Sequence, residues 1–122
     1  MIKLVLYFHF LLPTPENVYN ECLRQEVKEP EIVTRQFILE TGWAKSYNCI
    51  KRNNLFGLYD SRNHCYFTFN HWRESIRGYK NMIQYKYKGG DYYKFLTDLG
   101  YAEDKNYISK LKNIKLMLDN KK

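Results

Sequence analysis

The chain has 122 residues, which is enough for one compact domain with a core and a cleft but too few for two domains. Hydrophobic residues make up 44% and aromatic residues 17% of it, a composition that excludes an intrinsically disordered chain. A net charge of +7 at pH 7 favours an anionic partner (nucleic acid, an acidic membrane surface or an acidic polymer) without choosing among them.

The cysteines and histidines do not form a metal-binding motif. No C-x-x-C pair occurs and the histidines are scattered, which argues against a zinc site. No Gly-rich phosphate loop is present, so we expect neither a metal nor an organic cofactor. A disulfide between Cys49 and Cys65 would suit an exported protein, whereas the odd total of three cysteines equally suits free buried thiols.

Residues 1–13, MIKLVLYFHFLLP, are an apolar N-terminal segment with two interpretations. An early lysine followed by a short apolar run is typical of an export signal or its remnant, which would place the protein in the periplasm or outside the cell. The segment lacks an A-x-A cleavage site and His9 interrupts it, which favours instead a leading strand or packed arm. It is too short to cross a bilayer as a helix, so we expect no stable membrane insertion.

Two helices are predicted first, over residues 14–29 and 30–41. Thr14 can cap the first helix, and Pro15 suits its first helical position. Pro30 ends this helix and opens the next, which Gly42 can stop in a left-handed conformation. From residue 46 to residue 70 the helical period fails, and the alternation in CYFTF predicts a short hairpin around residues 60–63.

Three further helices are expected in the second half. Asn70 is expected to cap a helix over residues 71–87, which the KGG sequence then breaks. A short helix over residues 91–99 ends at Gly100, and a last helix begins at Asp104 and continues to Leu118. A basic tail, residues 119–122, follows. The sequence therefore predicts a mainly α (α+β) fold with one small β-hairpin.

Glu40 is unusual because it is a carboxylate on the largely apolar side of a predicted helix. On a helical wheel it lies between Val33 and Phe37 on one side and Leu39 and Ile32 on the other. Desolvation there raises the pKa of a carboxyl group, a property that a general acid for glycoside hydrolysis requires. The alternative is a structural glutamate at the helix end, paired with Arg35 or Lys45.

Four segments of the sequence occur together in one known family. They are RQFILETGWAKS, NNLFGLY, FNHWRESIRGY and FLTDLGYAEDKNYISKL. In their order and spacing the chain resembles the glucosaminidase-type peptidoglycan hydrolases, the flagellar and autolytic β-N-acetylglucosaminidases, from about Pro15 to Leu118. The resemblance implies a catalytic domain over residues 14–118 with a lysozyme-like helical fold and a short β-hairpin beside the substrate cleft.

The resemblance also implies an activity and its residues. The family cleaves the β-1,4 bond between N-acetylglucosamine and N-acetylmuramic acid, and its general acid falls on Glu40. Its N-N-L-F-G block, which lines the sugar cleft, falls on residues 53–57, and its tyrosine near the cleaved bond falls on Tyr101. Many members carry a second acid on a longer hairpin. Here Asp60 is the only acid in the hairpin. It can act as a nucleophile, a base or an electrostatic partner, or it can simply form the turn.

Several neighbouring side chains are candidates for substrate binding. Trp43, Phe56 and Tyr59 can stack on sugar faces, although each can equally belong to the core, Phe56 above all. Asn54 can hydrogen-bond an N-acetyl group, or it can cap the backbone of its own loop. Without a firm second carboxylate, a retaining, an inverting and a substrate-assisted mechanism all stay open.

Peptidoglycan glycan strands are the expected partner, because this polymer carries lactyl and peptide carboxylates that a basic surface attracts. We expect the protein to act as a monomer. One alternative is a non-catalytic glycan-binding domain of the same fold. A nucleic-acid binder is disfavoured, because the basic residues are scattered over every predicted helix and no nucleic-acid motif occurs.

Overall fold

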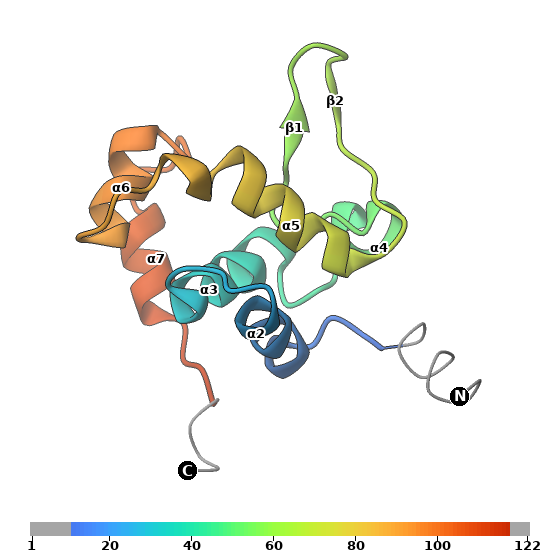
Figure 1. Ribbon diagram of the computed structural model, residues 1–122, viewed down its shortest axis with the longest axis horizontal. Coiled ribbons are helices and arrows are strands. Elements are labelled where there is room, and N and C mark those ends of the chain that lie inside the picture. The colour runs from blue at the N-terminus through green and yellow to red at the C-terminus, as the bar shows by residue number, and fades with distance from the viewer. Residues whose placement is uncertain (1–10, 118–122) are drawn as a thin grey trace.

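A computed structural model describes residues 11–117 of the chain, and it is mainly helical, as predicted. Helices form the body of the molecule, and one β-hairpin projects from it (Figure 1). Most of the predicted N-terminal arm and the basic tail lie outside the described residues. The elements are α2 (Pro15–Arg24), α3 (Pro30–Thr41), α4 (Tyr47–Arg52), β1 (Tyr59–Asp60), β2 (Cys65–Tyr66), α5 (Trp72–Met82), the 3-10 helix η1 (Gln84–Lys86), α6 (Tyr92–Leu99) and α7 (Tyr107–Asn113).

Helix α2 begins as predicted and ends earlier than predicted. The Thr14 hydroxyl accepts a hydrogen bond from the backbone N–H of Asn17 at 3.1 Å, and a proline occupies the first turn. The predicted continuation to residue 29 is wrong. Glu26 has a φ of 60°, and the chain turns so that Val27 enters the core. The residues around Val27 are polar, so a longer helix would have no apolar face there. Burial of the Val27 side chain therefore determines the course of the backbone after α2.

Helix α3 matches the prediction at both ends, whereas α4 was not predicted. Gly42 stops α3 in a left-handed conformation, and its N–H donates to the carbonyl of Ile38. In α4 the side chain of Ser46 accepts from the N–H of Cys49 at 3.1 Å, so Ser46 is its N-cap. A helix of six residues is too short to show a hydrophobic period, and the cap was its one local signal.

The hairpin lies where the alternation predicted it. Tyr59 is opposite Tyr66 and Asp60 is opposite Cys65 in an antiparallel pair. Cys65 is exposed on the hairpin, Cys49 is the buried residue of α4, and neither forms a disulfide. Of the two alternatives for the cysteines, the structure has the free thiols.

The start of α5 differs from the prediction by one residue. Its N-cap is His71, whose Nδ1 accepts from the N–H of Arg73 at 3.1 Å. The predicted cap, Asn70, instead donates its backbone N–H to the Glu74 carboxylate at 2.9 Å, which satisfies the chain just before the helix.

The C-terminal helices are shorter than the sequence suggested, except for α6. The predicted single helix over residues 71–87 is wrong, because it breaks at Ile83 and continues only as the short η1. Helix α6 has the expected end at Gly100, and its N-cap is Asp91, whose side chain accepts from the N–H groups of Tyr93 and Lys94. Helix α7 begins after the predicted position and ends before Ile114, whose backbone is extended.

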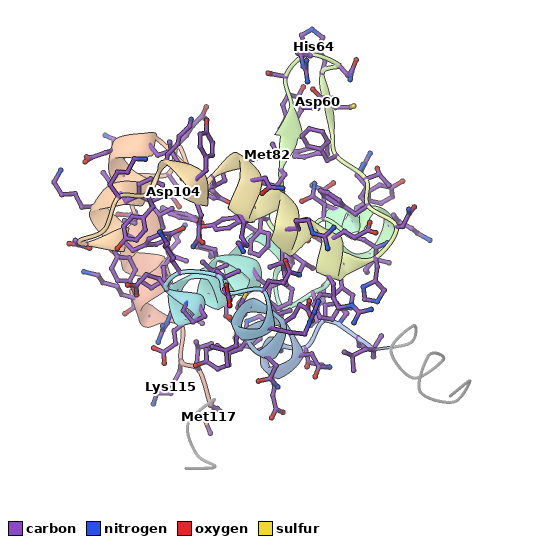
Figure 2. The ribbon with its side chains drawn as sticks, in the orientation of Figure 1. Asp60, His64, Met82, Asp104, Lys115 and Met117 are labelled. Carbon is purple, nitrogen blue, oxygen red and sulfur yellow. The ribbon has the colours of Figure 1, made fainter. Side chains whose placement is uncertain are left out.

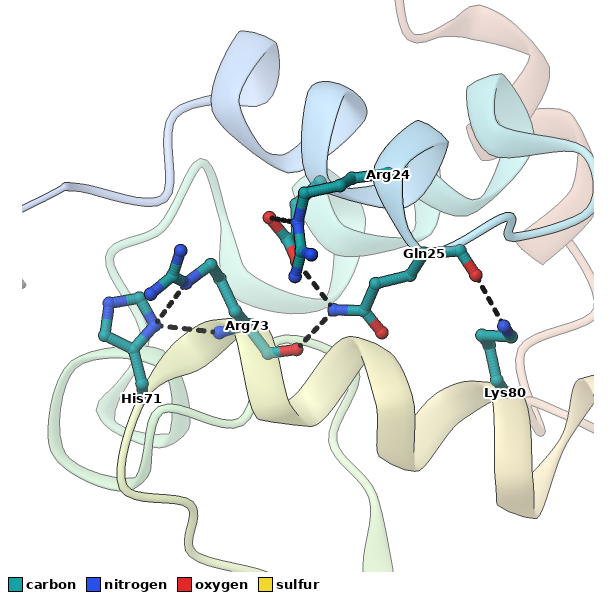
Figure 3. Close-up of polar contacts among 6 residues, drawn as sticks. Arg24, Gln25, His71, Arg73 and Lys80 are labelled. Carbon is teal, nitrogen blue, oxygen red and sulfur yellow. Dashed lines mark hydrogen bonds and ion pairs between the residues drawn. The ribbon is translucent and has the colours of Figure 1, made fainter. Parts of the chain in front are cut away.

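Packing brings α2 against α3 and α5, and α3 against α7. The end of α2 is fastened to α5 through Gln25, whose side-chain amide donates to the carbonyl of Arg73 at 3.0 Å (Figure 3). The amide also donates to Glu21 at 2.9 Å, and Lys80 donates to the backbone carbonyl of Gln25. These contacts orient the α2–α3 pair relative to α5.

A network of buried polar side chains joins α3, α5, η1, α6 and α7. Tyr79 on α5 donates its hydroxyl to the Gln36 amide oxygen on α3 and lies 2.7 Å from the Tyr92 hydroxyl on α6. The Gln36 amide nitrogen donates to the Tyr107 hydroxyl on α7 at 3.1 Å, and Gln84 on η1 donates to Tyr92 at 3.0 Å. Such a network holds all its elements in one arrangement only if every member is satisfied. None of the helices within residues 11–117 combines the length and the apolar character that a bilayer crossing demands.

Removal of one oxygen from this network should lower stability. In Tyr79→Phe, the buried oxygen of Gln36 loses its donor, and we expect the free energy of unfolding to fall by about 1–3 kcal/mol. Tyr85→Phe is the matched control, because Tyr85 is exposed and its loss of one hydroxyl should change stability by less than about 0.5 kcal/mol. Urea unfolding followed by circular dichroism measures both, and equal midpoints would mean that the network contributes nothing.

Candidate active site

Glu40 lies in the last turn of α3 at the wall of a surface cavity of about 330 Å³. Four parts of the chain meet there: the end of α3, the loop that leads into β1, the junction of α5 with η1, and the segment after α6. The cavity is lined by Glu40, Phe56, Gly57, Leu58, Tyr59, Met82, Ile83, Lys86, Leu99, Gly100 and Tyr101. Among these described lining residues, Glu40 alone carries a carboxyl group.

The Glu40 carboxyl packs directly on the backbone of Gly57. A β-carbon added at position 57 would lie only 3.1 Å from Glu40 Oε1, and the φ of Gly57 is +65°. Both features favour glycine, because a β-carbon would crowd the carboxyl so that it had to shift and would strain the backbone. The glycine of the N-N-L-F-G sequence thus leaves room for the acid on α3.

The environment of Glu40 favours its protonated form. Solvent reaches the side chain, yet the surrounding protein removes part of the hydration of the carboxyl, and this desolvation raises its pKa above the usual value. Within residues 11–117 Glu40 forms no ion pair with Arg35 or Lys45, the partners of the structural alternative. Arg35 instead donates to the carbonyl of Ile114 at 3.0 Å. The unpaired carboxyl is therefore available to a ligand in the cavity.

Tyr101 forms another part of the same wall. Its hydroxyl donates to the backbone carbonyl of Phe56 at 3.1 Å, and its ring stacks on Tyr107 with centroids 5.8 Å apart. Burial, followed by the neighbouring charges of Tyr107 and Glu40, raises the pKa of Tyr101 well above that of a free phenol. The hydroxyl therefore stays protonated near neutral pH and acts as a hydrogen-bond donor, not as a base.

Two predicted substrate-binding residues have structural positions instead. Asn54 is completely buried, and its side-chain amide donates to the carbonyls of Leu58 and Phe67 and accepts from the N–H of Leu58. It shapes the loop from inside and has no exposed surface, as in the backbone-capping alternative. Phe56 borders the cavity but is only 2% exposed, and its ring packs on Tyr79 at 4.6 Å, so it belongs to the core.

Asp60 lies away from Glu40. It is on the projecting hairpin, near the end marked by His64 (Figure 2). Its carboxylate accepts hydrogen bonds from the backbone of Arg62 and from the Asn63 side chain at 2.7 Å. The bond from Asn63 is the main reason that the pKa of Asp60 is lowered. This is the position of a turn former, and Asp60 does not line the Glu40 cavity.

The two exposed aromatic candidates, Tyr59 and Trp43, line different cavities. Tyr59 is 48% exposed and lines the Glu40 cavity, where its ring can meet a sugar. Trp43 is also exposed, with a φ of 62°, but it lines a different cavity of about 580 Å³ between the N-terminal segment, α4 and the start of α5. That larger cavity has an apolar wall and no carboxyl among its described lining residues. The structure thus brings Glu40, Tyr59 and Tyr101 together and leaves Trp43 apart.

One charged residue of the site was not singled out in the sequence. Lys86 is exposed and lines the Glu40 cavity from η1, which follows the break of the helix at Ile83. The apolar period continues through this break, so the sequence offered no signal for it. Within the described residues no group of three histidine, cysteine or acidic side chains could hold a metal ion.

The raised pKa of Glu40 has a consequence for stability. A carboxyl whose pKa is higher in the folded state favours folding at low pH, and this contribution is lost as pH rises through the folded pKa. Glu40→Gln, which mimics the neutral form, should therefore raise the melting temperature at pH 7, and the gain should shrink towards pH 4. Thermal unfolding across this range measures it.

Glu31→Gln is the control for that measurement. Glu31 is exposed in the first turn of the same helix, where the helix dipole favours a carboxylate, so its loss should not stabilise the protein at neutral pH. A Glu40→Gln protein that melts below wild type at pH 7 would contradict the proposed desolvation.

Comparison with known proteins assigns the chain to a family. The family model described as glucosaminidase, mannosyl-glycoprotein endo-beta-N-acetylglucosaminidase, matches residues 16–120. Neither the curated proteins nor the solved structures gave a match. The match includes α2 to α7 and all residues of the Glu40 cavity, and it agrees with the lysozyme-like helical fold and short hairpin expected from the sequence. The chain therefore belongs to the glucosaminidase family.

Proposed function

We propose that the protein hydrolyses the β-1,4 bond between N-acetylglucosamine and N-acetylmuramic acid in peptidoglycan, with Glu40 as the general acid. The observation that carries this proposal is the carboxyl of Glu40, which is partly desolvated, free of ion pairs among the described residues and held against Gly57 in a cavity. Membership of the glucosaminidase family supports a glycoside hydrolase. Peptidoglycan lies outside the cytoplasmic membrane, so the proposal includes export of the protein.

The chemistry explains why the acid must hold its proton. An alkoxide is a poor leaving group, and cleavage becomes feasible when a carboxylic acid protonates the glycosidic oxygen as the C–O bond breaks. A glutamate with an ordinary pKa is almost fully ionised near neutral pH and could not donate. Desolvation increases the protonated fraction of Glu40, which supports its assignment.

The position of Asp60 supports a mechanism assisted by the substrate itself. No second carboxyl lines the cavity among the described residues. In the proposed first step, the acetamido oxygen of the substrate bonds to the anomeric carbon while the glycosidic C–O bond breaks and Glu40 protonates the leaving oxygen. In the second step, Glu40 removes a proton from water, which attacks the anomeric carbon and reopens the acetamide. The two displacements retain the anomeric configuration.

The remaining residues of the cavity have proposed binding roles. Tyr59 offers an exposed ring for the apolar face of a sugar, and the Tyr101 hydroxyl, whose proton is donated to the Phe56 carbonyl, offers an acceptor oxygen at the wall. Lys86 supplies a positive charge that suits the carboxylates of muramic acid and its peptide. The ring and the positive charge favour an anionic glycan as the ligand.

A non-catalytic glycan-binding domain is the second candidate. The specific observation in its favour is the absence of a second carboxyl from the described lining of the cavity. The two candidates differ in turnover. An enzyme needs Glu40 to cleave the glycan, whereas a binding domain cleaves nothing and would use Glu40 for affinity alone.

Glu40→Gln should lower kcat on purified peptidoglycan by about 10²- to 10⁴-fold, because the variant has no proton to donate. Glu31→Gln, on the same helix, should retain activity. Reduction and mass spectrometry of the products identify the bond, and we expect new reducing N-acetylglucosamine ends. The first anomer formed, followed by NMR on a soluble oligosaccharide, should be β.

Each other result has a distinct meaning. New reducing N-acetylmuramic acid ends would retain Glu40 as the acid but make the protein a muramidase. An α anomer would replace substrate assistance by direct attack of water. No products from wild type, with both proteins still sedimenting with the wall, would favour the binding domain.

Gly57→Ala should reduce activity through the position of Glu40. The new methyl group would lie 3.1 Å from Oε1 and would displace the carboxyl, so we expect kcat/KM to fall at least tenfold. Gly42→Ala is the matched control, since its φ is +56° and nothing lies within 4 Å of the added carbon. Both variants should lose about 1 kcal/mol of stability from backbone strain, and only Gly57→Ala should lose activity. Equal activities would show that the Gly57 contact does not position the acid.

A further inference from the structure

A line of exposed side chains leads away from the Glu40 cavity along the hairpin. Tyr59, which lines the cavity, is the direct cross-strand partner of Tyr66. Their rings meet edge to face, with centroids 5.2 Å apart and planes at 84°. Both remain open to solvent, since Tyr59 is 48% and Tyr66 is 42% exposed. The hairpin thus presents a pair of aromatic rings that are each partly open to solvent.

The line continues onto α4 through an arginine. The Arg52 guanidinium lies 5.9 Å from the centroid of the Tyr66 ring and 4.7 Å from that of Tyr47. Asn48 orients it by accepting a hydrogen bond from Nη1 at 3.0 Å. Tyr47 is 65% exposed. Tyr59, Tyr66, Arg52 and Tyr47 therefore form a continuous surface, here called the aromatic platform.

Arg52 has a charge that the described protein does not neutralise. It forms no ion pair with a carboxylate within residues 11–117. Its planar group is fixed between two rings and by Asn48, so it loses little freedom when it binds an anion. A platform of rings with one oriented guanidinium suits a ligand that has apolar faces and carboxylates.

The size of the cavity explains why a polymer needs such a surface. At about 330 Å³, the cavity is near the lower limit of sites that enclose a drug-sized ligand, roughly 300 Å³. It can hold only a small part of a glycan strand. The rest of the strand must pass over the surface, and the platform begins at Tyr59 on the cavity wall.

We propose that the aromatic platform binds the glycan strand beyond the cleaved bond, with Tyr66 and Tyr47 stacked on sugar rings and Arg52 paired with a muramic acid or peptide carboxylate. This inference rests on the proposed function and adds to it an extended binding site. Tyr59 connects the two regions, because it belongs to both the cavity and the platform. Long strands are then held by contacts that short oligosaccharides do not reach.

The test uses the full chain with Glu40→Gln, which binds without turnover. Affinity for β-1,4-linked N-acetylglucosamine oligosaccharides of two and eight units is measured by calorimetry, with and without Tyr47→Ala and Tyr66→Ala together. We expect the octasaccharide to bind about tenfold more weakly, the loss that two ring contacts predict, and disaccharide affinity to change less than twofold. Tyr85→Ala is the control, because Tyr85 is 62% exposed and contacts Lys86 but lies outside the platform.

A second variant isolates the charge. Arg52→Gln should weaken binding of muramic acid-containing strands more than binding of the neutral oligosaccharides, and added salt should reduce this difference. Equal losses for both ligands would remove the proposed carboxylate contact. Thermal unfolding of each variant verifies that it is folded.

The outcomes separate the platform from the proposed function. If wild type cuts peptidoglycan but the double tyrosine variant binds the octasaccharide normally, the platform is wrong and the enzyme assignment stands. If wild type neither cuts nor binds any glycan, the proposed function is wrong. Tyrosine-dependent binding of a single-stranded DNA oligonucleotide, with octasaccharide affinity unchanged, would overturn the platform in favour of nucleic-acid stacking.

Discussion

The position of the acid depends on the buried hydrogen-bond network around Gln36. Gln36 and Glu40 are one turn apart on α3, so contacts that fix Gln36 also fix the face from which Glu40 projects. Gln36 is bonded to Tyr79 and Tyr107, and the Tyr107 ring stacks on Tyr101. Tyr101 in turn holds the carbonyl of Phe56, the residue before Gly57. The chain of contacts therefore returns to the glycine that faces Glu40, and one network sets both sides of the cavity.

This arrangement has a cost in stability that follows from the same geometry. Holding a carboxyl in a partly desolvated position without an ionic partner among the described residues disfavours its charged form. The buried tyrosines offset that cost, because their hydroxyls are satisfied and their rings fill the space between helices. Desolvation thus costs stability at Glu40, whereas satisfied hydrogen bonds and packed rings stabilise the core beside it, a combination expected at a functional site.

The sequence predicted those features that depend on local chemistry. Thr14 and the glycines at 42 and 100 act as caps through their own side chains or backbone conformations, so the ends that they set could be identified from neighbouring residues alone. The raised pKa of Glu40 also followed from the apolar residues beside it. The errors arose where contacts between residues far apart in the sequence determine where a helix ends. Burial of Val27 ends α2 early, and the break at Ile83 places Lys86 on the short η1 at the edge of the cavity. Neither effect has a local pattern.

The hairpin bears on both the proposed mechanism and the proposed glycan-binding surface. A two-residue strand pair closed by a tight turn needs its acid for the turn, and Asp60 is committed to hydrogen bonds with Arg62 and Asn63. Asp60 is therefore not among the residues that line the Glu40 cavity. In the mechanism that we propose, the second catalytic role belongs to the acetamide of the substrate, which is already attached beside the anomeric carbon. The proposed role of the hairpin is then to contribute affinity through its exposed rings at Tyr59 and Tyr66.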